Sequence, residues 1–450
     1  MNLNKNRYLF KPFFKCLFLY KILHLKTYLC KLSTKTNFLQ DYLFPLPKMT
    51  SWLPYSWFIS LVCLLQIHSL EAQSSRNNRG TFGVKKVHGA GFTAKDSSFS
   101  MMFRFRIQTQ AQAQTISGQN LNIASTQAQV RRLRLRFEGF LLDPRLTYYL
   151  QLSFSRPDMN IVDNGPPNVV RDAVVHYDLQ KWWRMSFGQT KLPGNRQRVV
   201  SSGSLQFAER SLANNHFTLD RDFGWFNTFR IGHERPVIIK TTISSGEGRN
   251  ASKSDNGLCY TARAEWIPFG QFAKDGDYSE GDVERTAVPS LSLGFGGSYN
   301  HKARRTGAQL GRFLQTPTDI QTLIADLLFK YQGWAVMGEV FYRTANSTIQ
   351  VKQPGDTLYV YQGNGLNIQA SRMLSASNEL ALRYVSVAPA AKLLPYEKQT
   401  DMIMLGFNRY LSAHRVKLQA SVYYQFLEGN MRVNHPGNAW GAYFQMEVGI

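Results

Sequence analysis

Cysteine is nearly missing from most of this 450-residue chain. Three of the four cysteines, Cys16, Cys30 and Cys63, precede residue 73, and Cys259 stands alone in the remainder. The body of the chain therefore offers no disulfide framework, no CxxC motif and no Cys/His cluster with zinc spacing. We expect neither a metal site nor another cofactor.

Long apolar runs and enzyme motifs are scarce as well. After residue 72 no run reaches the roughly 18 to 20 apolar residues that a membrane-spanning helix needs. A phosphate-binding loop of the GxxxxGK type is absent. His176 has Asp172 and Asp178 nearby, but no motif places a serine nucleophile with them. The sequence thus favours a structural histidine and a protein that is not an enzyme.

Acidic residues are outnumbered: 30 Asp and Glu stand against 53 Lys and Arg, a formal net charge of +23. The excess persists in the body of the chain, where 44 basic and 28 acidic residues follow from Gln73 onward. Such a balance indicates a partner of negative charge. Nucleic acid would satisfy it, but the export signal and the alternating strands described below argue against nucleic acid.

The first 97 residues differ from the rest. Lysines recur through residues 1–48 between short apolar runs that form no domain, so we expect translation to begin at Met49 and this piece to be an upstream extension. Trp57–Ile67 has the length of a signal-peptide core. Residues 49–72 are therefore expected to be a secretory signal cleaved after Ala72, with a buried strand or helix as the alternative. The polar residues 73–97 are expected to form a periplasmic leader.

Val130–Phe140 shows the pattern that organises the remainder. Its apolar residues Leu133, Leu135 and Phe137 alternate with arginines. A period of two is typical of a strand with one apolar face and one charged face. Comparable segments of about ten residues recur to the end of the chain, as they do in membrane barrels.

The connections between these segments alternate in length, with eight long polar joins, which include residues 109–129 and 301–320, and seven shorter ones, of which residues 269–288 form the longest. Sixteen antiparallel strands with loops sorted in this way indicate an all-β fold: a transmembrane β-barrel over residues 98–450, with short periplasmic turns and long extracellular loops. The apolar faces would meet lipid and the polar faces the lumen. The expected pore-lining anion ladder is Arg104, Arg106, Arg132, Arg134, Arg136, Arg145 and Arg184.

The third long loop, residues 191–221, contains apolar residues among its charges. It therefore has a reason to fold back into the lumen and narrow the pore. Its expected constriction residues are Lys191, Arg196, Arg198 and Arg210. A simpler interpretation of the neighbouring Glu209 and Arg210 is an ion pair that anchors the loop.

Four short motifs in a fixed order resemble the phosphate-selective porin O and P family: Val170–Tyr177, Phe187–Pro193, Phe207–Leu212 and Asp220–Gly224. The resemblance implies an outer-membrane porin of a Gram-negative bacterium, usually trimeric, with arginines along a pore that inward loops narrow. Carried over, Arg104, Arg106, Arg132, Arg134 and Arg136 match wall positions, and Arg210 matches the inward loop. The chain departs from bacterial barrels in ending at Ile450 instead of a phenylalanine.

A water-filled channel with fixed positive charge concentrates anions and excludes cations. The expected function is an anion-preferring channel for passive uptake of phosphate or other small anions, assembled as a homotrimer in outer-membrane lipid. Two alternatives stay open. One is a general, non-selective porin whose acidic residues balance the arginines, and the other is a plugged structural or adhesin barrel without transport.

Overall fold

The computed structural model describes residues 81–85, 89–159, 168–251, 257–353, 356–429, 431 and 437–450. The upstream extension, the signal peptide and the first part of the leader lie outside the described residues. The chain divides into two compact units, Met1–Asn77 and Asn78–Ile450, and all described residues belong to the second.

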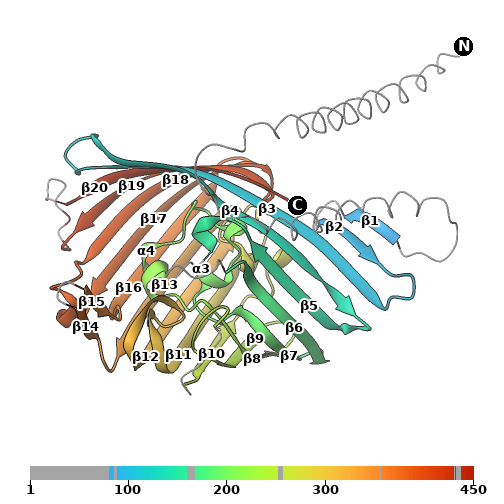
Figure 1. The fold of residues 1–450 in the computed structure, drawn as a ribbon. Coiled ribbons are helices and arrows are strands. Elements are labelled where there is room, and N and C mark those ends of the chain that lie inside the picture. The colour runs from blue at the N-terminus through green and yellow to red at the C-terminus, as the bar shows by residue number, and fades with distance from the viewer. Residues whose placement is uncertain are drawn as a thin grey trace, which may run out of the picture. The chain divides into compact units, whose positions relative to one another are not determined.

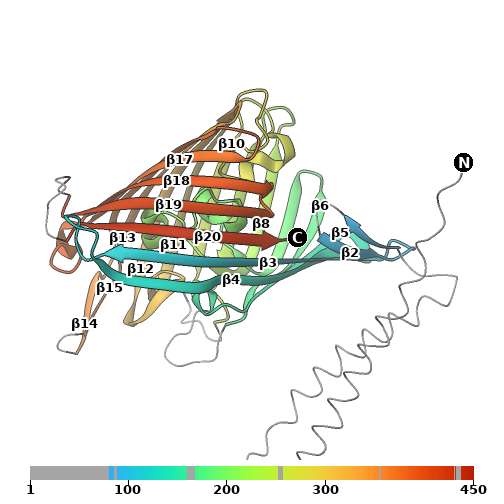
Figure 2. The same ribbon diagram turned by 90° about the horizontal axis from the view of Figure 1, so that it is seen from above.

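The second unit is a closed antiparallel β-barrel (Figures 1 and 2), which confirms the predicted fold class. Its sheet has 18 strands, of which β1 and β2 form an added hairpin and sixteen form the barrel. The barrel closes where β20 pairs with β3, with Ile107 opposite Val448. The barrel strands are β3 (Phe99–Thr115), β4 (Ile123–Leu141), β5 (Asp143–Ser153), β6 (Val170–Gln180), β7 (Trp183–Lys191), β8 (Arg221–Ile231), β9 (Val237–Ser244), β10 (Cys259–Trp266), β11 (Ser290–Gly307), β12 (Leu310–Tyr331), β13 (Trp334–Ala345), β16 (Gly363–Met373), β17 (Asn378–Pro389), β18 (Thr400–Ser412), β19 (Val416–Leu427) and β20 (Ala439–Gly449).

Smaller elements lie at the ends and inside the barrel. β1 (Thr81–Lys85) pairs with β2 (Gly89–Thr93), which in turn pairs with the start of β3. β14 (Ile349–Gln353) and β15 (Asp356–Tyr359) form a separate hairpin. The helical elements are η1 (Arg156–Asp158), α3 (Arg196–Val199), η2 (Ser202–Ser204), α4 (Leu212–Phe217), η3 (Ala273–Tyr278) and η4 (Ala391–Leu393). In the described ranges, none of the helices has the length and apolarity to cross a membrane.

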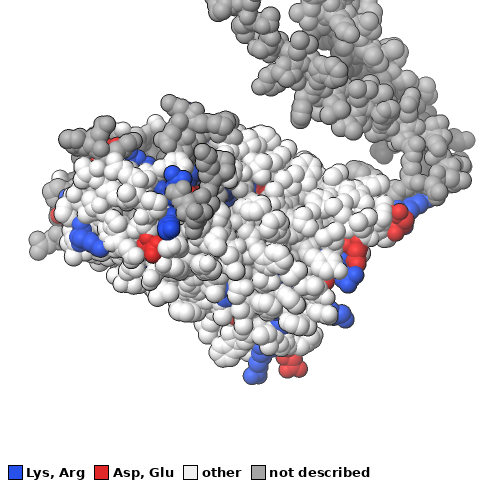
Figure 3. Space-filling view, turned by 60° about the horizontal axis from the view of Figure 1, so that its bottom comes forward, with Lys and Arg blue, Asp and Glu red and all other residues white. Residues whose placement is uncertain are grey.

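The wall strands alternate between the two faces of the barrel, as period-two sequences require. In β10, Thr261, Arg263 and Glu265 are buried inside, whereas Tyr260 and Trp266 are exposed on the outer surface. The face drawn in Figure 3 is correspondingly poor in charge between its margins. An apolar exterior around a polar interior is the arrangement expected in a bilayer, where the exterior contacts hydrocarbon.

One end of the barrel carries mostly short turns and the other mostly longer loops; we call them the turn end and the loop end. The segments 109–129 and 301–320, expected as loops, are mostly strand, because β3 pairs with β4 and β11 with β12 beyond those limits. Polar strands can continue past a membrane, since water satisfies both faces there. At the turn end, residues 267–289 between β10 and β11 form a much longer connection than the other turns.

Candidate functional site

The segment between β7 and β8, residues 192–220, crosses the interior of the barrel (Figure 1). Its apolar side chains explain why it folds inward: Leu205, Phe207 and Phe217 are almost fully buried. Phe217 stacks on Phe341 of β13 with ring centroids 5.8 Å apart. We call residues 192–220 the inner loop.

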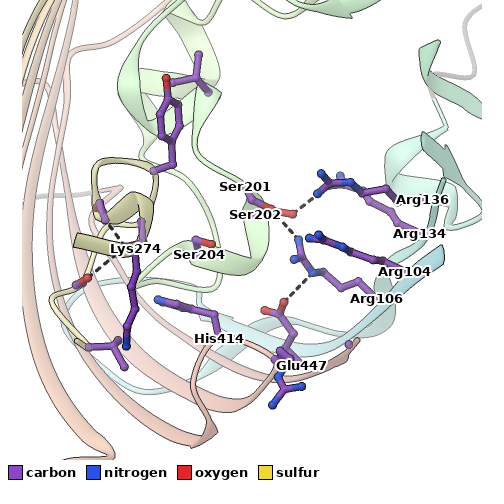
Figure 4. Close-up of a pocket in the computed structure, with 18 of the residues that line it drawn as sticks. Arg104, Arg106, Arg134, Arg136, Ser201, Ser202, Ser204, Lys274, His414 and Glu447 are labelled. Carbon is purple, nitrogen blue, oxygen red and sulfur yellow. Dashed lines mark hydrogen bonds and ion pairs between the residues drawn. The ribbon is translucent and has the colours of Figure 1, made fainter. Parts of the chain in front are cut away.

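Arginines of β3 and β4 hold one side of the inner loop. Arg106 Nη1 donates to Ser201 Oγ at 2.8 Å, and Arg134 Nη1 donates to Ser202 Oγ at 2.9 Å. Figure 4 shows these arginines projecting from the wall toward the serines. Both arginines face the inner loop because the alternation of side chains along each strand directs theirs into the barrel.

Glu209 fastens the same side of the inner loop by ion pairs to Arg131 at 2.5 Å and Arg132 at 3.1 Å. Burial by itself would raise the pKa of Glu209, but Arg132 and Arg131 lower it to about 2. The sequence suggested a pair between Glu209 and Arg210. Instead, Arg210 Nε and Nη2 donate to the backbone carbonyls of Gln197 and Val200.

Wall strands β12, β17 and β19 hold the inner loop with different chemistry. Arg196 of the loop pairs with Asp326 of β12 at 2.9 Å. Gln206 Nε2 donates to Glu379 of β17 at 2.8 Å. Lys417 of β19 donates to the Leu205 carbonyl at 2.8 Å. The loop therefore bridges strands that lie far apart around the barrel.

A cavity of about 770 Å³ lies between the inner loop, the β3–β4 wall and the turn end. Its lining includes three carboxylates, Asp282, Glu284 and Glu447, against twelve cationic side chains. The cations are Arg104, Arg106, Arg134, Arg136, Arg171, Lys191, Arg198, Arg210, Arg221, Lys274, Lys330 and Arg415. Seven of the eleven arginines and lysines singled out in the sequence thus meet at one cavity.

Three cavity arginines are more exposed to solvent than the carboxylates with which they pair. The side chains of Arg104, Arg106 and Arg136 are 29%, 28% and 34% exposed, whereas Glu447, the partner of Arg106, is 1% exposed. Glu138, which pairs with both Arg104 and Arg136, is intermediate at 21%. Water in the cavity therefore meets more positive than negative charge, and a small anion would find planar donors along the wall.

Four sequence-selected arginines lie away from this cavity. Arg145 and Arg184 line a second cavity of about 650 Å³ at the turn end, where Asp143 and Asp178 engage them at 2.7 and 2.6 Å. Arg132 and Arg196 line neither of these two cavities. Arg132 is buried behind the inner loop in its ion pair with Glu209, and Arg196 of the loop itself is buried against Asp326, because a buried charge must keep a partner.

Several cavity residues were not singled out from the sequence. Arg171 and Arg221 lie inside the family-like motifs, so those motifs were the available signal. Lys330 and Glu447 share strand parity with inward residues, but parity alone does not tell which inward side chains face water. Lys274 and Arg415 come from turns, for which the sequence provides no direction.

His176 has a neighbour that no motif revealed: its Nδ1 lies 2.7 Å from Ser186 Oγ. The nearby Asp178 is engaged by both nitrogens of the Arg184 fork, at 2.6 and 2.8 Å. The pair therefore lacks the carboxylate that orients a catalytic histidine. Among the described residues, no group of His, Cys, Asp and Glu has metal-binding geometry.

A closed antiparallel barrel with an apolar exterior and an inward loop defines the class of outer-membrane barrel channels. Residues 101–439 match the family of phosphate-selective porins O and P, and the chain belongs to this family. It is therefore a porin of the Gram-negative outer membrane. No curated protein sequence matches the chain.

The chain is also similar to solved porin structures at low identity. OmpT of Vibrio cholerae is 8% identical over 80% of this chain and 100% of its own, with a TM-score of 0.47. The channel DcaP of Acinetobacter baumannii is 11% identical over the same shares, also at 0.47. OmpF of Salmonella typhi, in complex with daunomycin, is 13% identical over 78% of this chain and 98% of its own, at 0.48.

Proposed function

We propose that this porin is an anion-preferring channel that admits phosphate or similar small anions by passive diffusion. One observation carries the proposal: Arg104, Arg106 and Arg136 of the main cavity are about a third exposed, while their partners Glu138 and Glu447 are less exposed. Fixed positive charge around confined water raises the local concentration of anions and lowers that of cations. Arginine suits this role because its guanidinium stays charged and offers two parallel donors to one oxyanion.

Passage requires sites that bind weakly enough to release the solute. Arg104 and Arg136 share Glu138, and Arg106 shares its donors between Ser201 and Glu447. An arriving anion must compete with these partners, which keeps each site shallow. A series of shallow, neighbouring sites lets an anion step along the wall.

The test is a reversal-potential measurement on the purified protein in a planar bilayer under a KCl gradient. We expect the reversal potential to have the sign of the chloride equilibrium potential. Added inorganic phosphate should lower the chloride current, because it occupies the same arginines. A cation-selective or non-selective potential would overturn the proposal in favour of a general porin. An unchanged chloride current with phosphate would restrict the channel to anions in general.

A barrel plugged by its inner loop is the second candidate. The observation in its favour is the buried state of Leu205, Phe207 and Phe217 and the attachment of the loop to opposite walls. A plugged barrel would show no conductance steps on insertion. The bilayer measurement therefore separates this candidate from both kinds of porin.

Export and assembly belong to the same proposal. The mature chain would begin after Ala72, with the turn end in the periplasm, the loop end outside the cell and three copies in one assembly. N-terminal sequencing of the membrane-extracted protein checks the cleavage. Its mass in detergent, measured by light scattering, checks the trimer.

A further inference from the structure

The connection between β10 and β11, residues 267–289, folds into the barrel from the turn end and contacts the inner loop there. Its Phe272 is buried in a cluster with Ile238, Leu328 and Met337 of the wall. These three wall residues form an apolar patch on the inner face of the barrel. The patch gives this turn a hydrophobic reason to enter the barrel. We call residues 267–289 the inner turn.

Lys330 of β12 anchors the inner turn with all three of its donors. Its Nζ donates to the carbonyls of Gly276 and Gly281 at 2.7 Å each and to Ser279 Oγ at 2.8 Å. A buried ammonium needs its donors satisfied. The turn supplies every one, so wall and turn are held together at this point.

The inner turn also divides the turn end of the barrel. Tyr278 lines both the cavity of about 770 Å³ and the cavity of about 650 Å³. Lys240 of β9 holds the tyrosine from the side of the second cavity, donating to its Oη at 2.8 Å. Without the turn, the two cavities would form one wider entrance.

Glu280 joins the inner turn to the inner loop. Its backbone N–H donates to the Ser204 carbonyl at 3.0 Å, and its carboxylate accepts from the Gln206 N–H at 2.8 Å. Gln197 Nε2 of the loop and Gln369 Nε2 of β16 donate to the same carboxylate at 3.0 and 3.1 Å. The Glu280 side chain is fully buried.

We propose that the inner turn is the second half of the constriction, and that Glu280 is the positioning residue that locks it to the inner loop. The inner loop narrows the barrel from the loop end and the inner turn supports it from the turn end. Glu280 fixes three loop groups at once, so its loss frees the middle of the loop. The inference deepens the proposed channel, because it assumes conduction through the barrel but not a particular ion selectivity.

The test compares single-channel conductance of full-length variants in planar bilayers. In Glu280→Gln the new amide N–H₂ meets groups that are themselves donors, so we expect an unsteady open level and a higher mean conductance. The matched control is Asp356→Asn on the β14–β15 hairpin. Asp356 is partly exposed, pairs with Arg312 and lines neither of the two cavities, so this control should conduct as the wild type does.

A second variant replaces residues 274–286 with a short Gly-Ser turn. Joining the two cavities should raise conductance about twofold, because a wider water-filled entrance carries more ions. Wild-type conductance and noise in Glu280→Gln and in the shortened variant would overturn the inference. If the shortened variant does not fold, the Glu280→Gln and Asp356→Asn pair decides the question alone.

The proposed anion preference and the proposed role of the inner turn can be rejected independently of each other. Selectivity is read from the sign of the wild-type reversal potential, whereas the inner turn is judged by conductance in the variants. A cation-selective channel with a raised conductance in Glu280→Gln would reject anion preference and keep the inner turn as part of the constriction.

Discussion

Arg106 Nε lies 2.9 Å from Glu447 Oε1; both residues line the main cavity, but the arginine side chain is 28% exposed and the glutamate 1%. The glutamate comes from β20 and the arginine from β3, so the pair spans the seam at which the barrel closes. A charged pair of the lumen thus lies directly at the seam where the barrel closes.

This pair yields a prediction with two opposite arms. Arg106→Gln removes a water-facing cation and should move the reversal potential toward zero, whereas Glu447→Gln removes the opposing charge and should move it further toward chloride. A unit charge at about 4 Å in water is worth about 1 kcal/mol, so each permeability ratio should change by a factor of about five. Shifts of the same sign in both variants would show that the pair acts by shape rather than by charge.

The fold was predictable from sequence because strand alternation is local: consecutive residues point to opposite faces of a strand, so their polarity shows which face is apolar. Arg131 shows where this fails. Its parity with Leu133 assigns it to the lipid face, yet it pairs with Glu209 inside. A bulge between the Gln108–Arg132 and Thr109–Val130 pairs provides the extra residue that turns it inward. Two consecutive arginines in an alternating strand were the only signal.

The site was less predictable than the fold, because its contacts join residues far apart in sequence. Arg196 was expected at the constriction, but Asp326, 130 residues later, holds it against the opposite wall. The inner turn was noticed only as a long member of the short class. Its direction follows from a buried patch around Leu328 and Met337, which no single strand reveals.

Glu209 makes the closed loop sensitive to acid. Its folded pKa is lowered to about 2, so its ion pairs contribute stability above the unfolded pKa of about 4.3 and lose it as pH falls toward 2. We expect steady conductance from pH 7 to about pH 5 and growing noise below about pH 4 as Arg131 and Arg132 lose their partner. Single-channel recording across this range checks it.

Glu209→Gln provides the control for the acid effect, since it removes the charge at every pH. The variant should show the noisy state already at pH 7 and little further change on acidification. Acid noise that persists unchanged in Glu209→Gln would assign the effect to another carboxylate.

Gly203 leaves room for the pair at the seam. A Cβ at this position would lie 2.2 Å from Arg106 Cζ and 2.5 Å from Glu447 Oε1, and both distances are too short for non-bonded atoms. Gly203→Ala should therefore displace Arg106 and lower both conductance and anion preference. Gly276→Ala is the matched control, because its added methyl would lie 3.5 Å from its nearest neighbour. Equal effects of the two substitutions would contradict a role for space at Gly203.

Phe207 is the apolar anchor of the inner loop on wall strands β17, β18 and β19. Its ring lies 4.0 Å below the Arg383 guanidinium and packs in a cluster with Met404 and Tyr423. Removing a buried aromatic ring costs about 3–5 kcal/mol of stability. Here the inner loop is destabilised rather than the barrel, because the strand ladder holds the barrel together.

We expect Phe207→Ala to insert and conduct as a barrel, but with rapid protease cleavage within residues 192–220. Limited proteolysis with mass spectrometry measures this, and Phe187→Ala on the outer face serves as the control. Wild-type resistance in Phe207→Ala would mean that the polar contacts alone hold the loop, and that the apolar residues noticed in the sequence do not set its path.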